Sequence, residues 1–306
     1  MCYGRPLSRA MTDRILFLAD QFVDAMRVSK LHYPGGAEQT DEGILAASPL
    51  PVERASVSNA DPAAIANFDL IVCGNLQRAQ PALLAALVAH GRHVLFEHDY
   101  RMCRYRGHYA RGMLHRLLDR CVCRQARFGP LFASALGVIF LTTRQLREYE
   151  KNPYLLLGAH AVLGCSVMGE SFFARVERHA KERPEKKGTV VVHSEDPIKG
   201  FRDSVAWCRA RGIEPEVLRG LGPDALLDAL SRAERLVFLP RWVEPASRLV
   251  VEARLLGCEV VGNERVGVMG EPFWGGSDAA AVEHLRDASA RFWRLVAGFR
   301  SGQPAR

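Results

Sequence analysis

Short apolar runs alternate with amphipathic helical patterns along most of the chain. In the first part, β-type runs occupy 14–20, 69–75, 93–99 and 136–143. Helical patterns follow them, one led by a glycine turn within 32–48 and others at 80–91 and 144–152. Strands that alternate with helices over short connections are typical of parallel sheets covered by helices. The pattern therefore predicts an α/β fold.

The alternation stops at a charged segment and then restarts. Residues 174–188 lack periodic apolar positions and contain a proline, so we interpret them as a linker or an exposed helix end. Further strands are expected at 189–194, 215–220, 235–240 and 258–263, with helices at 199–212, 223–233, 244–257 and 278–300. The chain is thus expected to form two Rossmann-like domains, 1–177 and 178–306, that face a cleft. The last helix is expected to pack back on the first domain.

Composition fits this two-domain expectation. The chain has 306 residues, of which 48% are hydrophobic and 25% charged, as in ordinary globular proteins. The first residues have no apolar run of a secretory signal, and no apolar stretch is long enough to span a membrane. Eight scattered cysteines fit a reducing compartment better than a disulfide scaffold. We therefore expect a cytoplasmic protein.

The charge is clearly basic. The formal net charge is +7 and the pI is about 9.1. The positive charge can reflect only an arginine-rich composition. It can also serve to attract a nucleotide phosphate, a nucleic acid or an acidic membrane surface. Charge alone does not choose among these.

Residues that follow the strands deserve most weight, because ligands of open α/β sheets bind beyond the carboxyl ends of the strands. Gly35 and Gly36 precede a helix and would let backbone approach a ligand closely, or form an ordinary turn. His98 follows the third strand and is either a ligand contact or structural. His193 and Lys199 are six residues apart across a turn. They could grip a diphosphate, or the lysine could simply be solvated.

The stretch EPASRLVVE holds a glutamate at each end, Glu244 and Glu252. Eight residues of separation on a helix bring both side chains to within about 80° of each other, two turns apart. Pro245 in the first helical position would make Glu244 the N-cap, where the helix dipole favours a carboxylate. Glu252 lies beside the apolar positions and is expected to be half buried with a partner. A capped surface helix with a solvated glutamate is the alternative.

These pieces together resemble retaining glycosyltransferases of the GT-B fold, of the family-4 kind. The stretch from Glu244 to Glu252, followed by Ala253, Gly257 and a strand, is similar to the E-x7-E motif in the second domain of that family. GGAE at 35–38 resembles its first-domain glycine loop, and EHD at 97–99 resembles its histidine segment. The resemblance covers both domains in the same order.

A fourth piece resembles the Arg-x5-Lys-Gly phosphate grip of the family. It runs from His193 to Lys199 and Gly200, with the histidine where an arginine is usual. The resemblance implies that Lys199, with His193 and Arg248, neutralises the diphosphate of the donor, and that Gly35 and Gly36 offer it backbone N–H groups.

The resemblance further implies transfer of a sugar from a UDP- or GDP-sugar with retention at the anomeric carbon. Glu252 would accept hydrogen bonds from the ribose hydroxyls. Glu244 and His98 would be the catalytic pair beside the transferred sugar. A glycosyl-transfer state is oxocarbenium-like, and a diphosphate leaving group needs fixed positive charge. If lysine and helix dipoles supply that charge, transfer requires no cofactor.

An arginine-rich insertion at 100–128 lies outside the resemblance. It contains Cys103, His108, His115, Cys121 and Cys123. Cys103, His115, Cys121 and Cys123 could form a structural zinc site, although the spacing is not that of a standard finger. Ordinary cytosolic cysteines are the alternative. The insertion follows the strand of His98, so we expect it to flank the acceptor side of the cleft.

The sequence leaves the acceptor open. A glycan or a lipid-linked glycan intermediate fits the basic insertion, and so does modified DNA with hydroxymethylated bases. Peripheral contact with an anionic membrane, at the inner face, is a further expectation. An epimerase of nucleotide sugars and a non-catalytic module that binds a nucleotide sugar or nucleic acid remain as alternatives to a transferase.

Overall fold

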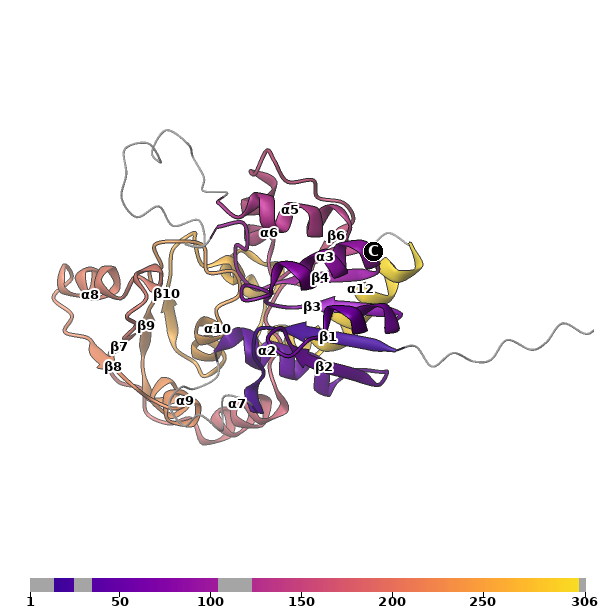
Figure 1. The fold of residues 1–306 in the computed structure, drawn as a ribbon. Coiled ribbons are helices and arrows are strands. Elements are labelled where there is room, and N and C mark those ends of the chain that lie inside the picture. Colours follow the sequence, from indigo (N-terminus) through magenta and orange to yellow (C-terminus); the bar gives the residue numbers. More distant parts are fainter. Residues whose placement is uncertain (1–13, 25–34, 104–122, 303–306) are drawn as a thin grey trace, which may run out of the picture.

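The computed structural model describes residues 14–24, 35–103 and 123–302, and it contains two parallel β-sheets. The first sheet has the order β2-β1-β3-β4-β5-β6 and the second the order β10-β9-β7-β8. We call the elements β1 to β6 with their helices the first half, and those from β7 to β10 the second half. Figure 1 shows the two sheets in separate lobes of the molecule.

The first half alternates strands and helices. Its strands are β1 (Ile15–Ala19), β2 (Val52–Ser56), β3 (Leu70–Cys73), β4 (His93–Glu97), β5 (Gly137–Phe140) and β6 (His160–Val162). Its helices are α2 (Gly36–Ala46), η1 (Pro62–Asn67), α3 (Pro81–His90), α5 (Gln125–Ala133) and α6 (Thr143–Glu150). The four central strands are buried along their whole length or nearly so, as expected of a sheet covered on both faces.

The second half is smaller and built in the same way. Its strands are β7 (Thr189–Val192), β8 (Glu216–Leu218), β9 (Arg235–Val237) and β10 (Glu259–Val261). Its helices are η2 (Pro197–Lys199), α8 (Phe201–Arg209), α9 (Pro223–Arg232) and α10 (Arg248–Leu255). In each sheet the strand order reverses once, beside β1 in the first and beside β7 in the second. Such switch points are where ligands bind in open α/β sheets.

The chain crosses from one half to the other twice. After β6, residues 163–169 lead into α7 (Glu170–Glu182) and the second half. After β10, the chain returns through η3 (Gly267–Gly270), η4 (Pro272–Gly275) and α11 (Asp278–Arg286) to α12 (Ala288–Ser301). The last helix packs on the first sheet, where the ring of Phe292 lies 4.9 Å from that of Phe96.

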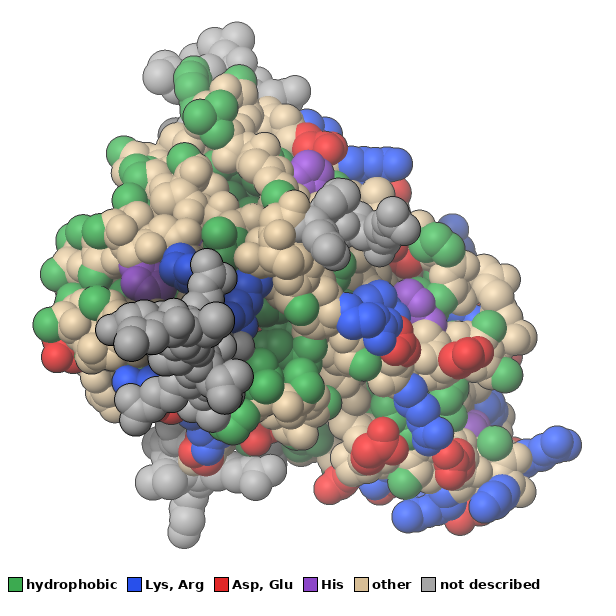
Figure 2. Space-filling view, turned by 90° about the vertical axis from the view of Figure 1, so that its right-hand side faces the viewer, with side chains coloured by type: hydrophobic (Ala, Val, Ile, Leu, Met, Phe, Trp, Pro, Cys, Tyr) green, Lys and Arg blue, Asp and Glu red, His purple; other side chains and the backbone are tan. Residues whose placement is uncertain are grey.

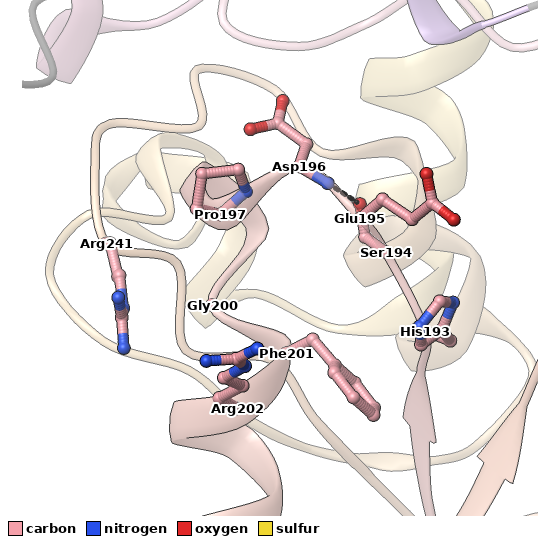
Figure 3. Close-up of a pocket in the computed structure, with 9 residues that line it drawn as sticks. All are labelled: His193, Ser194, Glu195, Asp196, Pro197, Gly200, Phe201, Arg202 and Arg241. Carbon is pink, nitrogen blue, oxygen red and sulfur yellow. Dashed lines mark hydrogen bonds between the residues drawn. The ribbon is translucent and has the colours of Figure 1, made fainter. Parts of the chain in front are cut away.

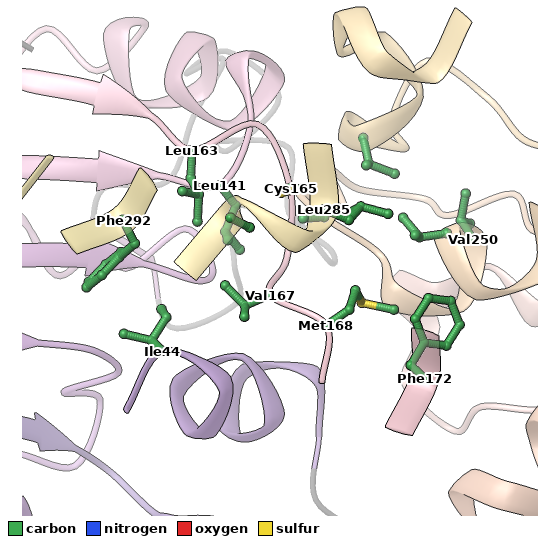
Figure 4. Packing of buried hydrophobic residues seen from close by; sticks show 14 of the residues in the cluster. Ile44, Leu141, Leu163, Cys165, Val167, Met168, Phe172, Val250, Leu285 and Phe292 are labelled. Carbon is green, nitrogen blue, oxygen red and sulfur yellow. The ribbon is translucent and has the colours of Figure 1, made fainter. Parts of the chain in front are cut away.

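One hydrophobic core runs through both halves. Alternate residues of the first sheet face opposite sides, so Phe17 and Phe96 belong to this core while Leu18 and Leu95 belong to the core of the other face. The crossing segment extends the first of these cores into the second half through Leu163, Cys165, Val167 and Met168. Figure 4 shows these side chains between Phe292 on one side and Val250 on the other. The two halves therefore share a core rather than only a surface contact.

Several boundaries differ from the prediction. Of the two interpretations of 174–188, the exposed helix end is the one found: residues 174–182 form the exposed end of α7, whose buried Phe172 and Phe173 anchor its first turn. The helix expected at 244–257 begins only at Arg248. The long helix expected at 278–300 is two helices that meet at Asp287. The edge strands β2 and β6 were not predicted.

Candidate functional site

A cavity of about 320 Å³ lies between the two halves, and six of the eight predicted catalytic and donor-binding residues line it. We call it the interdomain cavity. The first half contributes Gly35, Gly36, Ala37, Glu38, Asn75, His98, Asp99 and Leu141, Ser166 of the crossing segment adds a hydroxyl, and the second half contributes Asp196, Lys199 and Glu244 to Arg248. Residues more than 200 positions apart in the sequence thus meet at one place.

The amino end of α2 forms one wall. Gly35 is the N-cap in an extended conformation, with φ −73° and ψ 177°, and no side-chain hydrogen bond caps this end. A Cβ on Gly36 would lie 3.4 Å from Cδ of Arg248, so the two halves approach closely here. A helix amino end with backbone N–H groups directed at a cavity favours anionic groups.

His98 is held by a buried carboxylate. Its Nε2 lies 2.7 Å from Oδ1 of Asp41 in α2, and both side chains are 3% exposed. Burial by itself lowers the pKa of His98, but the negative charges of Asp41, Asp99 and Glu97 outweigh it and the net pKa is raised. The imidazole that borders the cavity is therefore biased toward its protonated form.

Lys199 lies on the opposite wall, at the end of η2. The Asp196 side chain accepts a hydrogen bond from the backbone N–H of Ile198 and so caps this short helix. Gly200 follows with φ +63°, and a Cβ there would lie 1.8 Å from the carbonyl oxygen of Leu239. Only glycine fits this left-handed, crowded position, which fixes where Lys199 enters the cavity.

Glu244 lies in a loop and not at a helix N-cap. Its backbone N–H donates to Arg265 O at 2.9 Å, and its carbonyl oxygen accepts from Gly267 N at 2.9 Å. The prediction of an N-cap was wrong because this bridge to the segment before η3 holds the residue extended, and Ser247 occupies the N-cap position instead. The side chain meets Lys199, whose Nζ lies 2.5 Å from Oε1.

Glu252 does not line the interdomain cavity. Its carboxylate faces Nε of Arg248 at 3.6 Å, and the two side chains are 12% and 11% exposed. Burial raises the pKa of Glu252 although Arg248 opposes it, and burial likewise lowers the pKa of Arg248. Arg248 also donates to the carbonyl oxygen of Val167, so it ties α10 to the crossing segment. The predicted partner of the half-buried glutamate is thus the arginine one turn earlier.

His193 lines a different cavity from Lys199. This second cavity, of about 530 Å³, lies over the carboxyl end of β7 and is bordered by residues 193–197, 200–202 and Arg241. The His193 ring lies edge-on to Phe201, with 4.8 Å between ring centroids, and Figure 3 shows the two rings side by side. Asp196 borders both cavities. The two predicted cations of the phosphate grip are therefore neighbours that face separate spaces.

The predicted zinc ligands are only partly described. His115 and Cys121, like His108, lie outside the described residues. Cys103 is buried and Cys123 is exposed. In the parts of the chain that the structure describes, three or more metal-ligating side chains gather nowhere. The zinc site stays a prediction.

Asp41 was missed by the sequence reasoning, although it has a recognisable signal. It lies four residues after Ala37 and three before Ile44, so it shares the face of α2 that carries apolar residues. A carboxylate on the buried face of a helix requires a partner. Asn75 and Ser166, which also line the interdomain cavity, follow β3 and β6 but carry no comparable signal.

Comparison with known proteins shows the fold. Neither the protein-family models nor the curated protein sequences match this chain. Among solved structures, Anabaena Alr3699/HepE in complex with UDP and glucose has 16% identity and a TM-score of 0.53, with 95% of this chain and 98% of that chain covered. A trehalose-phosphate synthase from Burkholderia xenovorans has 12% identity and a TM-score of 0.52, with 95% and 97% covered. WaaG, a glycosyltransferase involved in lipopolysaccharide biosynthesis, has 15% identity, a TM-score of 0.50 and 94% and 93% covered.

The chain therefore has the GT-B fold, two parallel-sheet α/β domains, as the sequence predicted. At these identities the likeness concerns the fold. Among residues 14–24, 35–103 and 123–302, none of the helices has both the length and the apolar character that a membrane span requires.

Proposed function

We propose that this protein is a glycosyltransferase that moves a sugar from a nucleoside-diphosphate donor to an acceptor in the interdomain cavity, with retention of anomeric configuration. One observation carries the proposal. The cavity gathers a lysine, a carboxylate, a histidine biased toward its charged form and a helix amino end from both halves of a GT-B fold. These groups match the charges that develop when a glycosyl diphosphate separates.

The leaving diphosphate determines the roles of the cations. As the bond from the anomeric carbon to the phosphate oxygen breaks, the electron pair and negative charge pass to the diphosphate. Lys199 and the amino end of α2, both at the cavity, would stabilise that charge, and Arg248 adds to the field. His193 would contact the donor from the second cavity, where the nucleoside side of the molecule has more room.

The carboxylate and the imidazole would face the sugar. Glu244 would stabilise the positive charge of the oxocarbenium-like state, and His98 would donate a hydrogen bond to a sugar hydroxyl. In retention without a covalent intermediate, the acceptor hydroxyl attacks from the face that the diphosphate leaves. The departing phosphate oxygen then takes the hydroxyl proton, so no separate base is needed.

The Lys199–Glu244 ion pair implies an order of events. Each side chain neutralises the other in the structure, with 2.5 Å between Nζ and Oε1. A diphosphate would compete for the lysine, and its binding would release Glu244 toward the sugar. The ribose role of Glu252 rests on the motif alone, because its carboxylate is engaged with Arg248.

Donor hydrolysis and transfer test the proposal. Purified protein is offered UDP-, GDP-, ADP- and TDP-sugars, and release of nucleoside diphosphate is measured. Lys199→Ala should lower turnover about 100-fold or more, as removal of one charge-stabilising group does elsewhere. Lys181→Ala is the matched control, since this exposed lysine lies on α7 away from the cavity. Equal turnover in wild type and Lys199→Ala, or donor binding without any turnover, would falsify the assignment.

The acceptor and the stereochemistry need a separate experiment. The accepted donor is combined with glycan, lipid-linked and hydroxymethylated-DNA acceptors, and the product is examined by NMR. Retention gives the same anomer as the donor. The opposite anomer would leave a glycosyltransferase but overturn the proposed retaining mechanism.

A further inference from the structure

Two large apolar side chains project from one loop of the first half. Tyr154 is 69% exposed and Leu156 is 76% exposed, whereas the other exposed large apolar residues of the described chain, Leu50 and Leu221, reach 42% and 37%. The loop connects α6 to β6, and residues 153–159 carry no charge. Two neighbouring apolar side chains this exposed favour a contact surface over chance.

The structure holds this loop firmly. Asn152 is 2% exposed; its side-chain Nδ2 donates to Gln125 Oε1 at 2.8 Å, and its side-chain Oδ1 accepts from Tyr154 N at 3.1 Å. Gln125 in turn donates to Tyr154 O at 2.7 Å. Leu155 and Leu157 point inward against the core of the first half. Alternation then places Tyr154 and Leu156 outward, so their exposure is built by the fold.

Residues 100–169 of the sequence are strongly basic. They contain eleven of the 41 Lys and Arg but only three of the 34 Asp and Glu, and five of the eleven lie at 104–122, outside the described residues. The rest of the chain has 30 basic and 31 acidic residues. Beside the loop, Arg147 is exposed at the end of α6, and Lys151 is 47% exposed, with its Nζ 3.0 Å from Oε1 of Glu148. Figure 2 shows acidic and basic side chains interspersed over the lower right of that face.

We propose that the loop around Tyr154 and Leu156, with Arg147 and Lys151 beside it, docks on an anionic lipid bilayer. Tyrosine and leucine enter the boundary between headgroups and acyl chains, while lysine and arginine pair with lipid phosphates. The loop lies on the outer side of the first half, next to α5 (Figure 1). Docking there leaves the interdomain cavity, which is built from other elements, open.

Lipid fits these side chains better than nucleic acid or protein does. A nucleic acid offers phosphates to Arg147 and Lys151, but a leucine that is 76% exposed gains little on a phosphate backbone. A protein partner or a second copy would need a broad complementary patch, whereas only two apolar side chains project here. A bilayer accepts a small apolar tip with a few basic side chains beside it.

Vesicle flotation tests the proposal, and it requires no sugar transfer. The full chain is mixed with vesicles of neutral phosphatidylcholine or of phosphatidylcholine with phosphatidylglycerol. Wild type should float with the anionic vesicles and much less with the neutral ones. Replacing both Tyr154→Ser and Leu156→Ser should lower the partition coefficient at least about tenfold. Replacing Arg147→Gln and Lys151→Gln should lower it on anionic vesicles only.

Leu221→Ser is the matched control, because Leu221 is an exposed leucine of the second half. It should bind vesicles as wild type does. Unchanged thermal unfolding of the double variants shows that they fold, as expected for exposed side chains. Equal flotation of wild type and the Tyr154/Leu156 variant overturns the proposal. Equal binding to neutral and anionic vesicles also overturns it. Tight binding to duplex DNA without vesicle binding, or loss of a dimer as the only effect of the Tyr154/Leu156 variant, does the same.

Discussion

The Asp41–His98 pair makes a pH-dependent contribution to stability. The pKa of His98 is raised in the folded protein. The Asp41–His98 pair therefore stabilises the fold fully below the ordinary histidine pKa of about 6.5. This contribution is lost as the pH rises through the raised pKa of His98. Asp41→Asn removes the charge that holds the proton. The free energy of unfolding, measured with urea across pH, should therefore differ most between wild type and variant in mild acid. The difference should shrink in alkali. A wild-type advantage over Asp41→Asn that grows with pH would contradict the raised pKa.

The Arg248–Glu252 pair gives a second prediction at the residue scale. Arg248→Ala leaves the carboxylate of Glu252 buried without its cation, which should cost about 3 kcal/mol of unfolding free energy near neutral pH. Replacing both residues by alanine should be less damaging than the single change, because no unpaired charge remains. Chemical denaturation of the two single variants and the double variant measures this coupling. Additive losses would show that the residues act independently.

At the residue scale, the sequence predicted which residues after the strands come together. It did not predict which side chains from other elements pair with them. Lys199, His98 and Glu244 meet at the cavity because the carboxyl ends of parallel strands share an edge. That Glu252 pairs with Arg248, and His98 with Asp41, depends on which helix face is buried. Periodicity indicates a buried face but does not identify the partner on it.

At the scale of the element, the end of η2 depends on Gly200. Gly200→Ala should destabilise the fold by at least about 2 kcal/mol, because the methyl group meets Leu239 O in addition to the left-handed strain. Gly212→Ala is the matched control, with φ +70° but nothing within 4 Å of the added Cβ. Thermal unfolding of both variants separates the clash from the strain. Equal destabilisation would mean that the contact with Leu239 relaxes freely.

Elements with a buried, uniform pattern were predictable and edge elements were not. The runs around β1, β3, β4 and β5 are apolar throughout because both faces of the sheet are covered. β2 reads VERAS and lies at the sheet edge, where its residues are half-buried or exposed and show no clear alternation. The late start of α10 has a tertiary cause, the bridge between Glu244 and Val266, which no local pattern contains.

At the scale of the whole molecule, α12 belongs to the core of the first half. Phe292 is 0% exposed and packs edge-on to Phe96. Phe292→Ala should cost about 3–5 kcal/mol of unfolding free energy through the cavity it leaves. Arg294→Ala, with a side chain that is 62% exposed two residues later, is the control and should change little. Hydrogen exchange should show the loss of protection in β4 and β5, not only in α12. Protection lost only in α12 would contradict a shared core.

The position of α12 also affects how the protein is made. The first sheet begins at Ile15, but the helix that covers part of it ends at Ser301. During synthesis from the amino end, the surface that Phe292, Trp293 and Phe299 will cover stays open while the entire second half is produced. A nascent chain would expose that apolar face to chaperones until α12 emerges. Termination of translation before α12 would consequently harm most the half that was translated first.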